Sequence, residues 1–208
     1  IGQWQQAQAT QGYTFVVYEV DVSDYESTQE LARRIHADGH RIDILVNNAG
    51  ITRDKFFPKM EKGQWDAVIN TNLNSLFNVT HHVSAKMAER GWGRIINIAS
   101  LQSHRAFPNS APYGAGKGGI VQLTRAIAVE WGPHGITCNA IGPGFFPTAL
   151  TAPVFDNSEL AARHAAQTCL GRNGALRDVY GLTVFLASEA SAYITGQTIM
   201  LDGGYTAK

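Results

Sequence analysis

The chain has 208 residues and a formal net charge of zero at pH 7, with no basic stripe along any segment. This balance argues against nucleic acid or another polyanion as a partner. No apolar run reaches the ~18 residues of a membrane span, and no basic stretch followed by an apolar one opens the chain, so we expect a cytoplasmic protein. The two cysteines, Cys138 and Cys169, lie far apart without a CxxC or CxxH neighbour, which predicts two buried free thiols and no metal site.

Apolar β-branched runs alternate with longer segments of helical periodicity, which is the pattern of an α/β fold. The first half predicts, in chain order, a helix over 3–11, a strand over 14–22, a helix over 23–38, a strand over 42–47 and a helix over 65–89. Gly12 stands where a glycine stops a helix, and Ser27 with Glu30 has the spacing of a capping box.

The second half continues this alternation. It predicts a strand over 94–98, a helix over 109–131, a strand over 136–141, a mobile lid with its own helix over 145–170, a helix over 179–188 and a strand over 198–201. Pro112 falls in the first turn of its helix, where proline is tolerated. There is no internal repeat and no linker, so residues 1–208 are predicted to form a single domain.

Ser100, Tyr113 and Lys117 form an array suited to proton transfer. Tyr113 and Lys117 are four residues apart in a predicted helix, so their side chains share one face. A neighbouring ammonium favours the phenolate, so we expect Lys117 to lower the pKa of Tyr113 from its ordinary value near 10. Ser100 ends a strand, where its hydroxyl can reach a substrate carbonyl oxygen. Reduction of that carbonyl needs a nicotinamide cofactor, because side chains cannot donate hydride.

Two alternatives apply to this region. The spacing of Tyr113 and Lys117 alone also fits a packed tyrosine beside a solvated lysine. Residues 114–119 match GxGxxG and could suggest a phosphate loop, but a phosphate loop should follow a buried strand directly. Here a loop with two prolines precedes the motif, which favours close helix packing instead.

Further motifs surround the array. They are Asn47-Asn48-Ala49-Gly50, Thr71-Asn72-Leu73, Pro143-Gly144 with Thr148, and Asp202-Gly203-Gly204. With them the chain resembles the short-chain dehydrogenase/reductase family from about residue 3 to its end. The resemblance implies a Rossmann-like three-layer αβα fold with a mostly parallel sheet, and an NAD(P)-dependent enzyme.

The resemblance also implies roles for single residues. The catalytic set would be a proton relay of Asn72, Ser100, Tyr113 and Lys117, in which Asn72 interrupts a helix and holds a water that connects Lys117 to solvent. The residues implied to contact NAD or NADP are Asp21, Val22, Asn48, Ala49, Gly50, Tyr113, Lys117, Pro143, Gly144 and Thr148. The family position that selects NAD or NADP ends its second strand, and this sequence holds no match for it.

The first fifty residues contain no strand followed by a glycine-rich turn and a helix, the usual cradle of the pyrophosphate. By the resemblance, the chain lacks the family's first β-α-β unit, and Ile1 in place of methionine agrees with a beginning further upstream. Three hypotheses stay open. Upstream residues exist outside this sequence, the strand over 14–22 packs beside the strand over 42–47, or an oligomer partner fills the gap.

The subfamily resemblance is divided. Residues up to about Ser100 resemble acetoacetyl-CoA reductases and the later residues resemble gluconate 5-dehydrogenases, so a chimeric gene is one hypothesis. We expect interconversion of a ketone and a secondary alcohol, on a 3-ketoacyl-CoA or sugar-acid type substrate. Arg105 and Arg172 could meet a substrate carboxylate or be surface charges. The competing hypothesis is a truncated or chimeric non-catalytic remnant that binds no cofactor. A homotetramer or homodimer is also implied, with the helices of Phe77 and Tyr113 at the interface.

Overall fold

A four-stranded parallel sheet forms the centre of the protein. The computed structural model describes residues 2–208, so Ile1 lies outside the described residues. The strands are β1 (Ile44–Asn47), β2 (Gly93–Ile98), β3 (Ile136–Pro143) and β4 (Thr198–Leu201), side by side in that order. Val46 lies opposite Ile96, and Ile96 lies opposite Asn139. The expected Rossmann-like architecture is confirmed.

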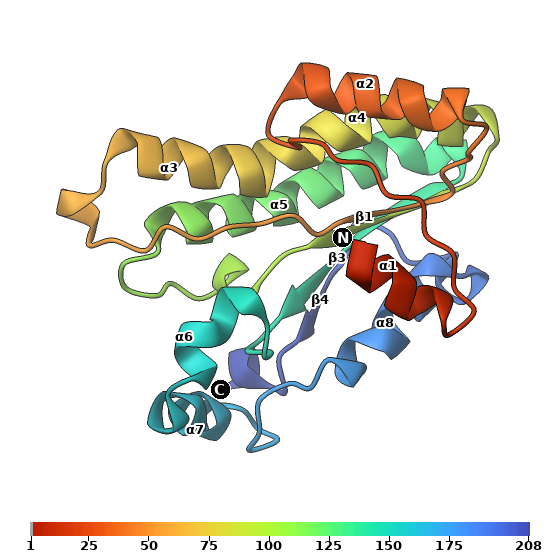
Figure 1. Ribbon diagram of the computed structural model, residues 1–208. Helices are drawn as coiled ribbons and strands as arrows, with labels where there is room; N and C mark the ends of the chain where they lie inside the picture. The colour runs from red at the N-terminus through yellow and green to blue at the C-terminus, as the bar shows by residue number, and fades with distance from the viewer. Residues whose placement is uncertain (1) are drawn as a thin grey trace.

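Helices cover both faces of the sheet (Figure 1). They are α1 (Gly2–Ala9), α2 (Tyr25–Ala37), α3 (Lys62–Ile69), α4 (Ser75–Glu89), α5 (Ala111–Trp131), α6 (Ala152–Phe155), α7 (Ser158–Gln167) and α8 (Arg177–Ala187). Helices α2 to α5 lie on one side and α1 with α8 on the other, which gives three layers. Helices α6 and α7 follow β3, in the segment predicted as a lid. Short 3-10 turns span Phe57–Lys59, Leu101–Ser103, Gly132–His134, Ala149–Thr151, Glu189–Ser191 and Tyr205–Ala207.

Strand β2 is buried on both faces. Ile95 packs in a cluster with Met87 of α4 and Ile127 of α5. The next residue, Ile96, packs with Leu186 of α8 on the opposite face. Successive side chains of a strand point to opposite sides, so a nearly continuous apolar run is expected where helices cover both faces.

A buried polar chain crosses the sheet beside these clusters. The Asn47 amide donates to Asn97 Oδ1 at 2.9 Å and to Thr80 Oγ1 at 3.1 Å. Asn97 in turn donates to Thr124 Oγ1 at 2.9 Å. These bonds satisfy groups that would be costly if buried without partners. Asn47 therefore joins β1 to both β2 and α4.

The strand predicted over 14–22 is wrong. Residues 14–20 have no regular secondary structure, and no backbone hydrogen bond within residues 2–208 joins them to β1. A strand forms only where its backbone groups pair with those of another strand, and in the described residues the backbone of this segment pairs with none. Phe15 and Val16 are accordingly 44% and 59% exposed. The hypothesis that this segment packs beside β1 is therefore also wrong for the described residues.

The capping box predicted at Ser27 and Glu30 is wrong as well. The cap of α2 is Asp24, whose carboxylate accepts a hydrogen bond from the Ser27 N–H at 2.6 Å. Glu30 is engaged one turn further on, in an ion pair with Arg33 at 2.6 Å. Gly12, by contrast, does follow a helix end, with a φ of +85° that favours glycine.

The long helix predicted over 65–89 is interrupted. Helix α3 ends at Ile69, a π-helical turn spans Asn70–Asn74, and α4 follows. Asn72 in the middle of this turn is fully buried. Its amide accepts from the Ile51 N–H at 2.8 Å and donates to the Ile51 carbonyl at 2.9 Å. Such turns occur mostly as single-turn bulges within α-helices and frequently mark functional sites.

The glycines of 114–119 lie inside α5, so the phosphate-loop alternative is wrong. A Cβ at Gly116 would lie 3.5 Å from the Asn72 Cβ, and one at Gly119 would lie 2.9 Å from Leu73 Cδ2. The small residues thus let α5 pack closely against the π-helical turn, as the close-packing interpretation predicts.

Cys138 is buried, as predicted, but Cys169 is exposed, so that part of the cysteine prediction is wrong. Cys169 lies in the turn after α7, where its thiol donates to the Gly204 carbonyl at the surface. Within residues 2–208, no helix has the length and apolar character to cross a membrane. In the same range, no three His, Cys, Asp or Glu side chains gather as metal ligands.

Candidate functional site

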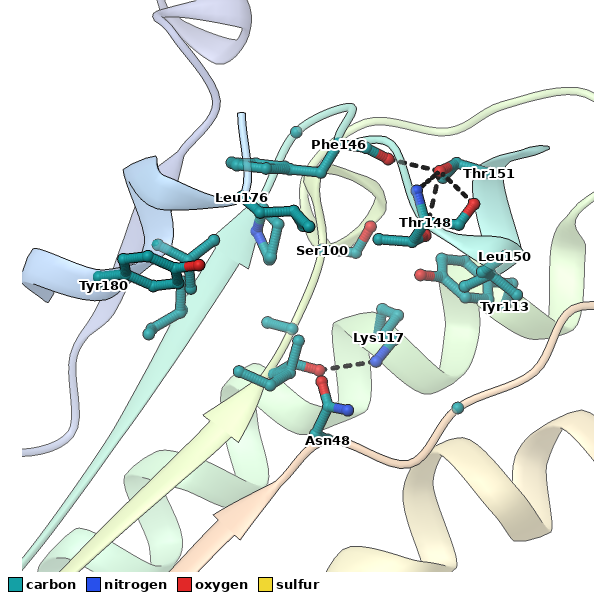
Figure 2. Close-up of a pocket in the computed structure, with 17 residues that line it drawn as sticks. Asn48, Ser100, Tyr113, Lys117, Phe146, Thr148, Leu150, Thr151, Leu176 and Tyr180 are labelled. Carbon is teal, nitrogen blue, oxygen red and sulfur yellow. Dashed lines mark hydrogen bonds between the residues drawn. The ribbon is translucent and has the colours of Figure 1, made fainter. Parts of the chain in front are cut away.

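A cavity of about 420 Å³ opens at the carboxyl ends of β2 and β3, between α5 and α8 (Figure 2). This is the edge at which open parallel sheets bind ligands. The cavity brings together these sequence-predicted residues: Asn48, Gly50, Ser100, Tyr113, Lys117, Pro143, Gly144 and Thr148. We call it the first cavity.

Ser100 is held firmly at the end of β2. Its Oγ accepts the Gln102 N–H at 3.1 Å and so caps the 3-10 turn that follows. Ser103 in that turn donates to the Lys117 carbonyl at 2.7 Å, which ties the turn to α5. The Ser100 hydroxyl can still donate its own proton to an oxygen in the cavity. Figure 2 shows the Ser100 and Tyr113 side chains approaching one another there.

The pKa of Tyr113 is raised, mainly by burial. The Ser100 hydroxyl lowers this pKa, and the negative charge of Asp54 raises it further. The expectation that Lys117 lowers it is therefore wrong for this structure. The lysine Nζ lies 5.6 Å from the tyrosine ring centre and directs its hydrogen bond elsewhere, so desolvation has the larger effect.

Lys117 is almost fully buried at 3% exposure, and its Nζ donates to the Ile98 carbonyl at 2.6 Å. Burial lowers the pKa of Lys117 to about 8. A lysine with such a pKa can hold or release a proton near neutral pH. Gly50 packs beside it, since a Cβ there would lie 3.8 Å from Nζ and 3.6 Å from Asn72 Oδ1.

Asn72 lies behind the cavity and does not line it. Both ends of its amide bond the backbone of Ile51, so its side chain fixes the segment after Gly50. Asn72 Oδ1 and Lys117 Nζ both lie close to Gly50, at 3.6 and 3.8 Å from a Cβ placed there, and the water implied between Asn72 and Lys117 stays a prediction.

Three of the predicted cofactor contacts lie away from the first cavity. Val22 and Ala49 line a separate hollow of about 130 Å³ beside β1. Asp21 turns back onto its own chain, where its carboxylate accepts from the backbone N–H and the hydroxyl of Ser23. These hydrogen bonds lower the pKa of Asp21.

A second cavity of about 200 Å³ adjoins the first. Ser100 and Tyr113 line both cavities, so the two spaces meet at these hydroxyl groups. The apolar part of the second cavity consists of Leu101, Phe107, Phe145, Leu150, Pro153 and Val154. A group bound in each cavity would meet the other beside Ser100 and Tyr113.

Sequence reasoning missed several residues that line these spaces. Phe146, Leu176 and Tyr180 line the first cavity, and Asp54 with Phe107 lines the second. Asp54 and Phe146 stand in segments that carry the subfamily resemblance, but neither was assigned to the site, and Phe107, Leu176 and Tyr180 stand in no motif. Tyr180 is 64% exposed on α8, and nothing in the sequence distinguishes it from any other exposed tyrosine on a helix. The one available signal was the assignment of 145–170 to a lid, which places that segment over the cleft.

The first cavity suits the nicotinamide end of a dinucleotide. Ile141, Leu176 and Val179 give it apolar walls, and Lys117 with Thr148 adds a few polar groups, the composition expected of a cofactor site. Within residues 2–208 no strand runs into a glycine-rich turn and helix that would cradle the pyrophosphate.

Comparison with known proteins agrees with this geometry. The family model described as enoyl-(acyl carrier protein) reductase matches residues 2–206. Nodulation protein G of Azospirillum brasilense is 47% identical over 97% of the chain and 81% of that protein. An acetoacetyl-CoA reductase of Allochromatium vinosum is 41% identical over 97% of the chain and 81% of the enzyme.

A solved gluconate 5-dehydrogenase from Burkholderia cenocepacia, in complex with NADP and tartrate, superposes with a TM-score of 0.93. It is 36% identical, over 99% of this chain and 81% of that one. Relatives of both kinds thus align across nearly the whole chain, beyond the halves from which each resemblance was drawn. The chain belongs to the short-chain dehydrogenase/reductase family and is an NAD(P)-dependent oxidoreductase.

Proposed function

We propose that the protein interconverts a ketone and a secondary alcohol, with Tyr113 as the general acid and base. The observation that carries this proposal is that Ser100 and Tyr113 lie where two cavities meet, with Lys117 beside them in the first cavity. The first cavity would hold the nicotinamide, which supplies the hydride, and the second would hold the substrate. Gly50, Pro143, Gly144 and Thr148 would contact the cofactor in the first cavity, beside Asn48.

The two pKa values set the direction in which protons move. Tyr113, with its pKa raised above 10, is a phenol at neutral pH and can donate a proton to the substrate oxygen. Ser100 would donate a hydrogen bond to the same oxygen and hold it in place. Lys117, with a pKa of about 8, is the stronger acid and can return a proton to the phenolate. Asn72 would support this relay from behind Gly50.

Tyr113→Phe tests the proposal because it removes the hydroxyl group that would donate the proton and keeps the aromatic ring. We expect kcat for ketone reduction to fall by roughly 10²–10⁴-fold, the usual contribution of a general acid. Tyr113 also lines the first cavity, so cofactor affinity is measured separately by titration and the change in kcat is compared at saturating cofactor. The assay uses NADH and NADPH in parallel, since the cofactor is not restricted to one of them. Tyr193→Phe is the matched control, because Tyr193 is fully exposed and lines neither cavity.

The alternative is a truncated or chimeric non-catalytic remnant that keeps the fold and the subunit interfaces but does not bind cofactor. Intact mass followed by titration with NAD(H) and NADP(H) separates the two. A chain of these 208 residues that binds neither cofactor would overturn the enzyme proposal. Binding and turnover that depend on Tyr113 would exclude the remnant.

We further propose that residues 1–208 act as one domain, that the protein works in the cytoplasm, and that it assembles as a homotetramer or homodimer through α4 and α5. Exposed apolar side chains support this interface, with Phe77 on α4 at 52% and Val129 on α5 at 78% exposure. The substrate would be of the 3-ketoacyl-CoA or sugar-acid type, as in the named relatives.

A further inference from the structure

The charged side chain that lines the second cavity is acidic, with no basic side chain beside it among the described residues. Among the described residues that line it, Asp54 is the one acidic side chain and no Lys, Arg or His is present; the other polar side chains are the amide of Gln102 and hydroxyl groups. Thr52 donates its hydroxyl to the Asp54 carboxylate, which holds that group at the rim. Asp54 also acts on the reacting centre, since its charge raises the pKa of Tyr113.

No cation balances this carboxylate in the second cavity. Arg105, a candidate for meeting a substrate carboxylate, donates to the backbone carbonyl of Lys208. Arg172, the other candidate, pairs with Asp178 at 2.6 Å. Neither arginine lines the second cavity. Lys117 lines the first cavity and is directed at the Ile98 carbonyl.

We infer that Asp54 is a specificity-determining residue, which makes the second cavity accept a ketone with uncharged, mainly apolar substituents and reject one with a carboxylate beside the carbonyl. This inference rests on the proposed function, because the substrate carbonyl must lie between Ser100 and Tyr113. A carboxylate on that substrate would enter a space that holds one negative charge and six apolar side chains. A neutral ester or thioester would meet the apolar walls without a negative charge to be repelled by Asp54.

Electrostatic repulsion sets the size of the effect. Two like charges several Å apart at the protein surface repel enough to change affinity by roughly tenfold at low salt. Asp54 is exposed in this structure, so added salt weakens the repulsion. The discrimination is therefore expected to be strong at low ionic strength and smaller at high ionic strength.

The experiment compares acetoacetate with ethyl acetoacetate, which differ in one charge next to the same ketone. We measure kcat/KM for both with wild type and with Asp54→Asn, at about 20 mM and 500 mM salt. Asparagine keeps the shape and can still accept the bond from Thr52. We expect wild type to favour the ester by at least about tenfold at low salt, and Asp54→Asn to reduce that ratio about three- to tenfold through faster use of acetoacetate.

Asp66→Asn is the control for net charge, because Asp66 is on α3 and pairs with Lys62 away from both cavities. It should leave the substrate ratio unchanged. The ester also buries an ethyl group, which favours it in every variant. The decisive quantity is therefore the change in the ratio of the two kcat/KM values between wild type and Asp54→Asn. A ratio that is the same in wild type and Asp54→Asn would overturn the inference.

Binding gives a readout that does not depend on turnover. Ligand-observed NMR with ethyl 3-hydroxybutyrate and 3-hydroxybutyrate measures both affinities in wild type and Asp54→Asn. If neither ketone is reduced with NADH or NADPH, the proposed function fails, while a preference for the neutral ester that Asp54→Asn weakens still supports the charge selection. Equal discrimination by both proteins in this assay overturns the inference whatever the activity.

Discussion

Lys117 shows how burial adapts one residue to proton transfer. Its ammonium is enclosed by β2, the turn after β1 and α5, and its one hydrogen bond goes to the Ile98 carbonyl. A charge held there is less well solvated than in the unfolded chain, so the folded protein binds its proton less tightly. The same burial that suits the chemistry therefore lowers stability at neutral pH.

Lys117→Met should raise the free energy of unfolding, in a way that depends on pH. The pKa of Lys117 is lowered from 10.5 to about 8, so the unfolded chain binds more protons between these values and wild-type stability rises with pH in that range. We expect the variant to be more stable by about 3 kcal/mol near pH 7 and by about 1 kcal/mol near pH 9.5. Urea denaturation at both pH values measures this difference.

Lys86→Met is the control for this measurement, because Lys86 is exposed and pairs with Glu89. Its effect should not change between the two pH values. Loss of the bond to Ile98 adds a constant to the Lys117 result, so the change with pH is the informative quantity. A difference that stays constant between the two pH values would contradict the assigned pKa.

Prediction from sequence succeeded for residues whose neighbours are set by local geometry. Tyr113 and Lys117 were predicted to share a helix face, and Ser100 was predicted to end a strand. The structure places all three side chains in the first cavity. Asp54 and Tyr180 could not be found in this way. Asp54 lies 59 residues before Tyr113 in the sequence, and Tyr180 lies 67 residues after it. Only the folded chain brings these residues to the two cavities beside Tyr113. The direction of the Tyr113 pKa was missed because burial is not visible in a sequence.

At the scale of elements, close packing accounts for two of the four glycines of α5. Gly116 and Gly119 face the π-helical turn, whereas Gly118 has only the Ser103 carbonyl within 4.0 Å of a Cβ placed there. Glycine in a helix interior is about 1 kcal/mol less favourable than alanine. At Gly118 no close contact compensates for that loss.

Gly118→Ala should therefore stabilise the protein by about 0.5–1 kcal/mol in thermal or urea denaturation. Gly119→Ala is the matched variant. It has the same helix propensity gain, but its Cβ would lie 2.9 Å from Leu73 Cδ2, so the leucine must shift. We expect Gly119→Ala to be less stable than Gly118→Ala. Equal stabilities would show that the π-helical turn adjusts without strain.

Most elements could be located from periodicity, and the failures have one physical origin. The segment 14–22 reads as a strand because of Phe15, Val16 and Val17, yet it lies unpaired. Strand propensity reflects a fit to neighbouring strands more than an intrinsic backbone preference. The interruption of 65–89 at Asn70–Asn74 is not visible in the periodicity, although the family resemblance implied a helix interrupted at Asn72, as the structure shows.

At the scale of the molecule, the proposed assembly makes a direct prediction. Tyr25 stacks on Phe77 at 6.2 Å, and this aromatic pair lies on the outer surface formed by α2 and α4. Burial of such a surface between subunits would remove apolar area from water. Light scattering should give a mass of two or four chains for wild type and a smaller one for Phe77→Glu.

Phe56→Glu is the comparison for the assembly experiment. Phe56 is 60% exposed and belongs to neither α4 nor α5, so Phe56→Glu makes the same chemical change outside these helices. It should leave the mass unchanged. A monomeric wild type would oppose the proposed interface.

The π-helical turn at Asn70–Asn74 also limits how this chain can change in evolution. An α-helix advances about 100° per residue, and the wider π-helical turn holds one residue more over about the same rotation, so loss of one residue from the turn would restore an ordinary helix and leave α4 in register. Thr80 would then keep its bond from Asn47, but the wide turn that directs Asn72 at the Ile51 backbone would be lost. Substitutions can accumulate along α4, but a single-residue deletion between 70 and 74 would release the segment after Gly50 that Asn72 fixes. The length of this segment is therefore expected to be fixed more strictly than its composition.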